Sequence, residues 1–200
     1  MANPYGGFVP RGKTLLGSGA ALTDRPDAEG ITATFDDVDY DNPPKMRSLN
    51  KNTCILVRNA SGISLLPGRM VRWKAAQRGK QVDGYTAATA AEAAGIVDEW
   101  LPTAGAADKD IFWILTDGVS RVLSDLVGDT DTNFSENDLL VAITAATSQA
   151  TSAGRMKQAD FTGATSLLAD QIINAIGRAM SANTTSQTNR QVLMKVKKLF

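Results

Sequence analysis

Residues 110–123 read DIFWILTDGVSRVL. The run from Ile111 to Leu115 is apolar at every position, which is typical of a strand buried on both faces in a barrel or sandwich core. Asp117 and Gly118 follow it, and this dipeptide between two apolar runs favours a tight hairpin turn. A glycine bulge inside one long bent strand gives the same pattern, so the sequence leaves both interpretations open.

Shorter apolar runs, separated by turn residues, extend this pattern in both directions. The other predicted strands are 53–58, 69–74, 94–100, 138–143 and 191–199, and 176–180 is either a further strand or the second half of a helix. Pro67-Gly68 predicts a type II turn before 69–74, and the alternation of Val71 and Trp73 with charged residues predicts that this strand is half exposed. Strands at intervals of roughly 10 to 15 residues, with turns between them, describe an antiparallel β-barrel or sandwich.

Little helix is expected. Residues 77–93 form a polar, alanine-rich connection, in which 89–94 fits one helical turn. The clearest helix pattern begins near Thr162, with apolar residues spaced three and four apart. Gly177 disfavours a helix interior by about 1 kcal/mol relative to alanine, so this helix either passes through it or ends near Asn174. We therefore expect a mainly β chain with one or two short helices.

The first 50 residues differ in texture from the rest. They are rich in glycine and proline and show no sustained periodicity, which predicts an extended N-terminal arm over 1–50 and a β-barrel domain over 51–200. Such an arm is either floppy or ordered by lying on a partner, and its scattered apolar residues favour a partner. The expected anchors are Tyr5, Phe8, Pro10, Arg11, Leu15, Leu16 and Phe35.

Composition weighs against catalysis. The chain has no histidine, which removes the commonest general base and most zinc-ligand sets. Its one cysteine, Cys54, lies in an apolar run and is predicted to be a buried thiol. We therefore expect no enzymatic activity, no catalytic residues, no cofactor and no metal.

Charge and hydropathy also restrict the partners. Lysine plus arginine and aspartate plus glutamate number 21 each, so no strong net field is present to attract nucleic acid or an anionic membrane. The longest apolar runs fall far short of the roughly 20 residues that span a bilayer, and no export signal is visible at the N-terminus. We expect neither a nucleic-acid nor a membrane partner.

Two acidic clusters have the alternating spacing of a calcium loop. They are Asp37, Asp39 and Asp41, and Asp129, Asp131 and Asn133. Both lack the glycine and the glutamate that a calcium loop needs further on, so solvated loops are the preferred interpretation. Gly7 to Thr14 formally fits the phosphate-binding expression, but Pro10 interrupts it and no strand and helix flank it, so we expect no nucleotide site.

The C-terminal strand carries a basic face. Lys195 and Lys197 alternate with Val196, which is typical of a solvated edge strand protected against aggregation. The functional alternative is a basic edge that meets an acidic partner surface. On that alternative, the possible C-terminal contacts are Lys195, Lys197, Leu199 and Phe200.

The order of these segments resembles the small β-barrel capsid decoration, or cement, proteins of tailed bacteriophages. The resemblance is carried by Leu66–Val71, Ala94–Val97, Ile111–Ile114 with Gly118-Val119, Asn137–Val141 and Ile176–Ala179. The opening Met1–Phe8 is also similar to the start of proteins found near phage head genes. The segment 77–93 and the helix near residue 165 depart from the simplest members of that family.

The resemblance implies a structural virion protein that binds the major capsid protein lattice on the outside of the head and stabilises it. It further implies a homo-oligomer, trimer or dimer, that is made in the bacterial host cytoplasm. An arm with sparse apolar anchors suits this role, since repetition over a symmetric lattice turns modest affinity into strong retention.

Three alternatives remain open at the level of sequence. The first is another virion component, such as a head fibre base or a tail protein. The second is a carbohydrate-binding β module, for which Trp73, Trp100 and Trp113 would have to form an exposed cluster. The third is a carboxylate-only enzyme using Asp98 and Glu99, which is the weakest because neighbouring residues of a strand point to opposite faces.

Overall fold

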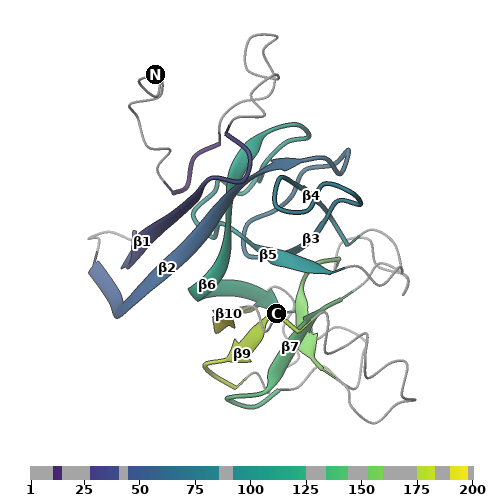
Figure 1. Ribbon diagram of the computed structural model, residues 1–200. Helices are drawn as coiled ribbons and strands as arrows, with labels where there is room; N and C mark the ends of the chain where they lie inside the picture. Colours follow the sequence, from purple (N-terminus) through teal and green to yellow (C-terminus); the bar gives the residue numbers. More distant parts are fainter. Residues whose placement is uncertain are drawn as a thin grey trace.

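The computed structural model describes residues 11–14, 28–40, 45–85, 92–124, 134–143, 153–159, 175–182 and 190–197. These residues form a mainly β structure without helix, as expected from the short apolar runs. The strands are β1 Thr32–Asp39, β2 Lys45–Asn59, β3 Met70–Trp73, β4 Gln81–Asp83, β5 Ala93–Val97, β6 Ile111–Ser124, β7 Leu139–Ala142, β8 Met156–Gln158, β9 Gly177–Ala179 and β10 Arg190–Lys197 (Figure 1).

All ten strands belong to one sheet, in the order β1-β2-β4-β3-β5-β6-β10-β9-β7-β8. Most neighbours are antiparallel, as predicted, but β2 with β4 and β6 with β8 pair in parallel. Two further pairings, β2 with β6 and β6 with β8, link strands that are distant in this order. The pairings therefore return to β6 twice, once through β2, β4, β3 and β5, and once through β10, β9, β7 and β8.

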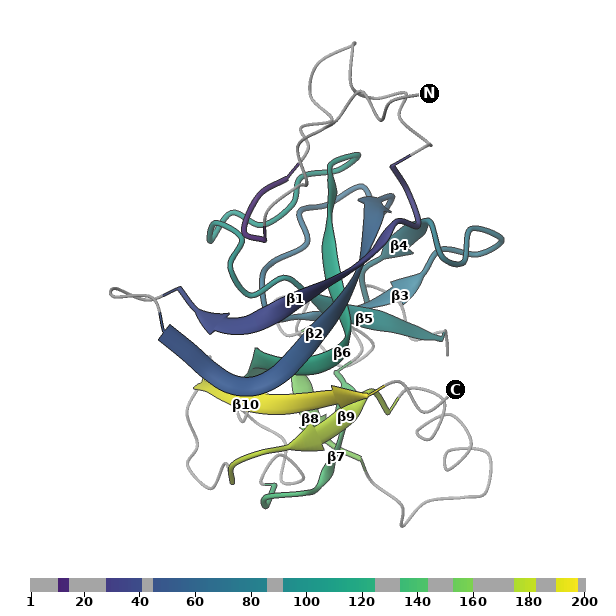
Figure 2. The same cartoon turned by 60° about the vertical axis from the view of Figure 1, so that its left-hand side comes forward.

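Strand β6 is the common member of both groups (Figures 1 and 2). Its first part pairs with β2, where Trp113 faces Leu56, and its second part pairs with β10, where Val122 faces Val192. The prediction of a strand buried on both faces is confirmed. Trp113 belongs to one hydrophobic cluster and its neighbour Phe112 to another, on the opposite side of the strand.

The Asp117-Gly118 step is a bend within β6, so the bulge interpretation is correct and the hairpin interpretation is wrong. The pairing with β2 shifts by one residue here, since Thr53 faces Asp117 while Cys54 faces Leu115. Gly118 has φ +129°, and a Cβ on it would lie 2.1 Å from Oδ1 of Asn52. That oxygen accepts a hydrogen bond from the backbone N–H of Val119 at 2.8 Å, so the glycine lets β6 lie directly against β2.

Several other sequence predictions are confirmed. Strands 53–58, 94–100 and 138–143 correspond to β2, β5 and β7, and the described part of 191–199 corresponds to β10. Of the two alternatives for 176–180, the strand is correct, as β9. Gly68 has φ +69°, as the predicted turn after Pro67 requires. The helix near Thr162 lies outside the described residues.

Other predictions were wrong. Strand β3 is buried at all four positions, because it lies between β4 and β5 and Arg72 is paired with Asp83. The connection 77–93 contains β4, and its last residue, Ala93, begins β5 instead of continuing a helical turn. Strand β8 lies just after Gly154-Arg155, where a loop was expected to end.

The largest correction concerns the N-terminal arm. Residues 32–39 and 45–50, which were assigned to an extended arm, form β1 and the first part of β2. Strand β1 is paired with β2 from Thr32 opposite Ile55 to Asp39 opposite Lys45. Sequence analysis missed β1 because it is rich in aspartate, which is depleted in strands.

No helix in the described ranges has the length and hydropathy needed to cross a membrane.

Candidate interaction surface

The β1–β2 hairpin projects from the body of the molecule (Figure 2). Its pairing is interrupted by a large bulge. Val38 faces Met46 and Asp36 faces Lys51, so the four residues 47–50 of β2 lie opposite Asp37 alone. A bulge bends its strand and redirects the side chains that it carries.

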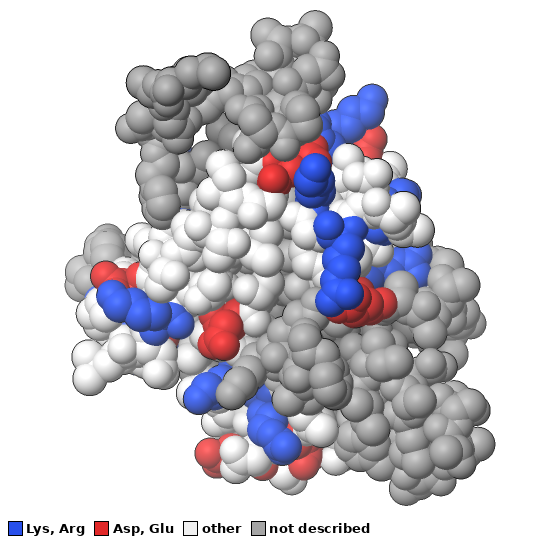
Figure 3. Space-filling view, viewed as in Figure 1, with Lys and Arg blue, Asp and Glu red and all other residues white. Residues whose placement is uncertain are grey.

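The bulge presents Leu49 to solvent. Its side chain is 96% exposed, and Met46 and Tyr40 nearby are 51% and 48% exposed. Only three other large hydrophobic residues are exposed in the described part of the chain: Ile31, Ile63 and Met180. In Figure 3, which is drawn in the view of Figure 1, basic and acidic atoms gather at the outer end of the hairpin, and most of the remaining described surface over β1 and β2 is uncharged. We call Tyr40, Met46 and Leu49 the hairpin surface.

Arg47 fixes the inner side of the bulge. Its guanidinium donates to Oδ1 of Asp37 from Nη2 at 2.6 Å and from Nε at 2.9 Å. It also forms a bidentate pair with Glu99, from Nη1 to Oε2 at 2.9 Å and from Nη2 to Oε1 at 2.8 Å. A fork of this kind defines orientation as well as position. Arg47 therefore ties the hairpin to the loop that follows β5.

Arg47 belongs to a larger ion-pair cluster, which joins residue 11, β1, β2, the loop after β5 and β6. Its members are Arg11, Asp37, Asp39, Arg47, Asp98, Glu99 and Arg121. Arg121 of β6 lies 2.7 Å from Oδ2 of Asp39 and also approaches Glu99. Ser48 and Asn52 add hydrogen bonds to the buried carboxylate of Asp37. Each carboxylate of the cluster thus lies against at least one arginine, as buried charges require.

Arg11 occupies the deepest cationic position. Its side chain is fully buried, and its Nη2 lies 2.9 Å from Oδ1 of Asp98. The backbone N–H of Gly12 donates to the other oxygen of the same carboxylate at 2.6 Å. Gly12 has φ +76°, and a Cβ there would lie 2.8 Å from the carbonyl oxygen of Trp100. These contacts attach residues 11 and 12 to the body of the molecule.

The electrostatics of the cluster favour permanently charged arginines. Burial lowers the pKa of Arg11, but the charge of Asp98, interactions with Cys54 and Glu99 and the hydrogen bond to Asp98 together raise it above its ordinary value. Burial likewise lowers the pKa of Arg47, while hydrogen bonds to Glu99 and Asp37 raise it above its ordinary value. The carboxylates of the cluster therefore favour the charged forms of Arg11 and Arg47.

Aromatic rings connect this cluster to the hairpin surface. The guanidinium carbon of Arg121 lies 5.1 Å from the centre of the Trp100 ring. Tyr40 meets the same ring edge to face, with the ring centres 5.1 Å apart. Tyr40 is thus half exposed, and its contact with the Trp100 ring holds its side chain in place.

The structure describes two of the seven predicted arm anchors, Arg11 and Phe35. Tyr5, Phe8, Pro10, Leu15 and Leu16 lie outside the described residues. The expectation that Arg11 anchors an arm on a partner is wrong, because its side chain is buried in an ion pair within its own domain. Phe35 is also not an arm anchor: it lies in β1 and packs edge to face on Trp113, with the ring centres 5.3 Å apart.

Two of the predicted C-terminal contacts, Lys195 and Lys197, lie on an internal strand. β10 pairs with β6 on one side and β9 on the other, so the expectation of an edge strand was wrong. Lys195 is exposed on this strand, and Lys197 is its last residue. Leu199 and Phe200 lie outside the described residues.

The acidic cluster around Asp37 is not a solvated loop. Asp37 and Asp39 alternate on one face of β1 and are buried against Arg47 and Arg121. Their calcium-like spacing therefore reflects the two-residue period of a strand. Among the described residues, no group of histidine, cysteine, aspartate or glutamate side chains is arranged to hold a metal ion. Asp41, Asp129, Asp131 and Asn133 lie outside those residues.

Asp98 and Glu99 also differ from expectation. They were predicted to point to opposite faces of a strand, but β5 ends at Val97 and the chain turns. Both carboxylates consequently approach Arg11, Asp98 at 2.9 Å and Glu99 at 3.7 Å. Their shared role here is to bind arginine side chains.

The three tryptophans do not form an exposed platform. Trp113 and Trp73 are buried, and Trp100 is half buried against Tyr40 and Arg121. Stacking on a sugar requires an accessible ring face, so this arrangement does not favour a carbohydrate-binding module.

The hairpin surface was missed by sequence analysis. Leu49 follows Arg47 and Ser48 in a polar stretch, and nothing in that stretch signals which side chain faces solvent. The only signal was a lone leucine among polar residues, which is common on protein surfaces.

No protein-family model matches this chain, and no curated protein is significantly similar to it.

Proposed function

We propose that this protein is a structural component of the outer surface of a phage head, where it binds the major capsid protein lattice through the hairpin surface. The observation that carries the proposal is the nearly complete exposure of Leu49 beside Arg47, whose side chain is only 10% exposed and fixes the strand. The segment resemblance to capsid decoration proteins supplies the identity of the partner. The proposed location is the virion exterior after synthesis in the host cytoplasm, and the proposed state on the shell is a trimer or dimer.

The geometry suits an anchor that is ready to bind. An interface gains most from a few buried apolar or aromatic side chains that are already ordered, because little conformational entropy is then lost on binding. Burial of one leucine contributes about 1.5 to 3 kcal/mol. Met46 and Tyr40 extend the apolar area on the same hairpin, and each capsid repeat would offer the same contact again.

The body of the molecule would act as a rigid support for the hairpin, which we call the holder. We infer that each of the two closed circuits of strand pairing forms a small β-barrel, with β6 shared between them. A closed barrel leaves no free sheet edge within it, which limits unwanted strand pairing. The shared strand would couple the two barrels and keep the hairpin in one orientation.

The proposal retains the predicted N-terminal contacts with the capsid, except for Arg11. Arg11 and Gly12 are attached to Asp98 and form part of the holder. Tyr5, Phe8, Pro10, Leu15 and Leu16 are proposed to contact the capsid on either side of that attachment. The possible contacts at Lys195, Lys197, Leu199 and Phe200 are proposed as secondary.

The test uses heads of the parent phage that lack this protein. Purified wild-type protein and the Leu49→Ser variant are titrated onto expanded heads, and occupancy is measured by sedimentation and gel densitometry. The matched control is Ile63→Ser, which replaces another exposed aliphatic residue. Ile63 lies after the end of β2, outside the hairpin surface. We expect at least tenfold weaker binding for Leu49→Ser and wild-type binding for Ile63→Ser.

Two results would overturn the proposal. The first is wild-type occupancy by Leu49→Ser when its thermal unfolding matches that of the wild type. The second is failure of the wild-type protein to bind heads, and binding to isolated tails instead would assign it to another virion component.

A further inference from the structure

Strand β1 has a free edge. The two closed circuits of strand pairing contain nine of the ten strands, and β1 is the one strand that belongs to neither. It pairs with β2 on one side, and no strand in the described part of the chain pairs with its other side. In Figure 1, β1 lies on the outer side of β2, away from β6. A free edge presents backbone donors and acceptors to which a further strand can bind.

The register of the β1–β2 pair shows which backbone groups point to the free side. The carbonyl oxygen of Ile31 accepts a hydrogen bond from the N–H of Leu56 at 2.8 Å, so the backbone groups of Ile31 point toward β2. These directions alternate along an antiparallel strand, and the register has no shift between residues 32 and 36. The residues whose N–H and C=O groups point away from β2 are therefore Thr32, Thr34 and Asp36. We call these three residues the β1 edge.

The side chains of the β1 edge are also accessible. All three are exposed. Thr32 and Thr34 are β-branched, which favours an extended conformation. Asp36 is the only charged residue of the three, and it is paired with Lys51 of the neighbouring strand. β1 contains neither proline nor lysine, the residues that commonly protect an edge strand from pairing.

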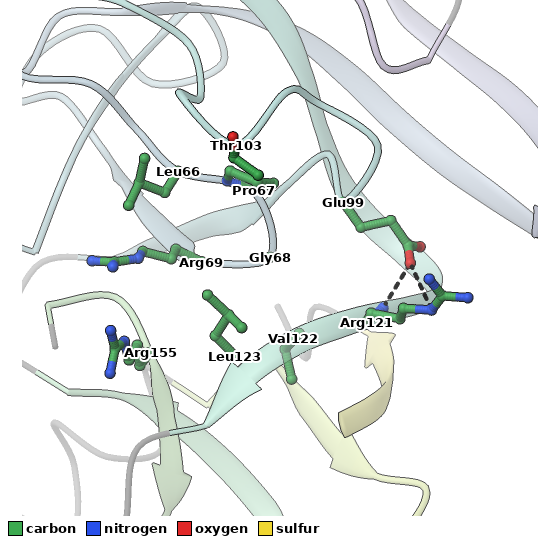
Figure 4. Close-up of a pocket in the computed structure, with 10 residues that line it drawn as sticks. All are labelled: Leu66, Pro67, Gly68, Arg69, Glu99, Thr103, Arg121, Val122, Leu123 and Arg155. Atoms are coloured by element: carbon green, nitrogen blue, oxygen red, sulfur yellow. Dashed lines mark hydrogen bonds and ion pairs between the residues drawn. The ribbon is translucent and has the colours of Figure 1, made fainter. Parts of the chain in front are cut away.

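The strand that carries this edge is held in place by the body of the molecule. At its far end, Oδ2 of Asp39 lies 2.7 Å from Nη2 of Arg121. The carboxylate of Glu99 accepts a hydrogen bond from the backbone N–H of Arg121 at 3.2 Å, at one end of the pocket in Figure 4. Phe35 packs edge to face on Trp113. An ordered edge loses little conformational entropy when a strand adds to it.

We propose that the β1 edge pairs with the same edge of a second copy of this chain, antiparallel about a two-fold axis. The axis passes between Thr34 and Thr34 of the second copy, and Thr32 of each copy then faces Asp36 of the other. This register uses all three residues of the β1 edge, with two backbone hydrogen bonds at each pair, as in any antiparallel ladder. Such an interface is self-complementary, as two-fold symmetry requires.

Charge distribution favours this register and a second copy as the occupant. An axis at Asp36 would place two carboxylates directly opposite each other, which is destabilising. With the axis at Thr34, the two Asp36 side chains are four positions apart along the strands, or about 13 Å. Threonines that face each other across antiparallel strands form a favourable pair. The β1 edge is therefore complementary to itself.

The dimer supplies an interface for the assembled state proposed above, but it does not rest on capsid binding. The pairing uses residues 32–36 and runs the two hairpins in opposite directions. Tyr40 of each copy then lies about 20 Å from the axis, measured along the strand. The two hairpin surfaces lie at opposite ends of the dimer, which therefore has two separate anchors for a lattice.

The experiment measures self-association of the full-length protein by sedimentation velocity without phage heads, from about 10 µM to about 1 mM. A short strand pair is a small interface, so we expect dimers toward the upper end of this range. Thr34→Lys places two like charges opposite each other at the axis and should weaken dimerisation at least tenfold. The matched control is Thr53→Lys, which adds the same charge to the residue of β2 that faces Thr34. It should dimerise within about threefold of the wild type.

A charge exchange tests the symmetry of the pair. Thr34→Glu alone should also dimerise at least tenfold more weakly than the wild type. An equal mixture of Thr34→Lys and Thr34→Glu should associate at least tenfold more tightly than either variant alone, because opposite charges then meet at the axis. Hydrogen exchange followed by NMR gives a second readout. In the wild type, the amides of the β1 edge should exchange more slowly as the concentration rises.

The proposal fails if the wild type is monomeric at about 1 mM, or if Thr34→Lys dimerises as tightly as the wild type. A mixture of the two charged variants that associates no more tightly than its components would exclude an axis at Thr34. Loss of the dimer in Leu49→Ser but not in Thr34→Lys would place the interface on the hairpin surface and would also overturn the proposal. A wild-type protein that dimerises in solution but does not bind heads would contradict capsid binding alone.

Discussion

Arg47 and Asp37 face each other across the bulge of the β1–β2 hairpin, with Nη2 2.6 Å from Oδ1. The pair is buried on the aspartate side, where the side chain has no solvent exposure. It lies beneath the same bulge that presents Leu49 to solvent. The local geometry of the hairpin surface therefore depends on an ion pair that is itself largely shielded from solvent.

Replacement of Arg47 by methionine should destabilise the protein strongly. Asp37 would then remain buried without its cation, and loss of one partner of a buried pair costs about 3 kcal/mol or more. Urea unfolding followed by tryptophan fluorescence measures the change. The control is Lys51→Met, which breaks the exposed pair between Lys51 and Asp36 and should cost less than about 0.5 kcal/mol. Equal losses of unfolding free energy in the two variants would mean that the buried pair stabilises the protein no more than the exposed pair does.

The attachment of Arg11 to Asp98 makes a separate prediction about the N-terminal residues. Arg11→Met should cost about 3 kcal/mol and should speed hydrogen exchange of the Gly12 amide, which donates to the same carboxylate. Exchange measured by mass spectrometry on peptides covering residues 11–14 gives the second readout. Lys13→Met is the control, because Lys13 is exposed, and its exchange should match that of the wild type. Unchanged exchange in Arg11→Met would contradict the attachment.

Gly118→Ala tests the bend in β6. A Cβ at this position would lie 2.1 Å from Oδ1 of Asn52 and 2.9 Å from its Cα, and the backbone has φ +129°. We expect a loss of more than about 2 kcal/mol, since both the clash and the backbone strain must be relieved. Gly62→Ala shares the positive φ but meets no atom within 4 Å, and should cost about 1 kcal/mol. A smaller loss for Gly118→Ala than for Gly62→Ala in thermal unfolding would refute this account.

The sequence was informative wherever burial leaves a local pattern. Ile111 to Leu115 signalled a strand with two buried faces, because every position is apolar and both faces do lie in hydrophobic clusters. Gly68 signalled its turn, because a positive φ restricts the choice of residue. Gly118 was ambiguous, and the choice of a bend over a hairpin depends on Asn52, which is distant in the chain.

The sequence was misleading where distant residues decide the outcome. Asp37 and Asp39 suggested a loop or a calcium site, and β1 was missed, because their cations come from β2 and β6. Arg11 was expected to contact a partner protein, but its side chain is buried against Asp98 of the same chain. The exposure of Leu49 results from the register of a bulge, which no local pattern encodes.

The pH dependence of stability should contain a contribution from Cys54. Burial raises the pKa of this thiol to about 12 from an ordinary value of 9.0, and the charge of Arg11 lowers it only in part. The folded state thus favours the protonated thiol. Its contribution to stability is complete below pH 9.0 and is lost as the pH rises toward about 12, since the unfolded chain ionises first.

The measurement compares the wild type with Cys54→Ala, which cannot ionise. Between about pH 9 and pH 11 the unfolding free energy of the wild type should fall relative to that of the variant, approaching about 1.4 kcal/mol per pH unit. At pH 8 the native thiol should also react with a disulfide reagent far more slowly than the urea-unfolded chain, because thiolate is scarce and buried. Parallel stability curves for the two proteins across this range would show that Cys54 is hydrated in the folded state, and the packing of β2 against β6 around it would then have to be looser than the contacts described above.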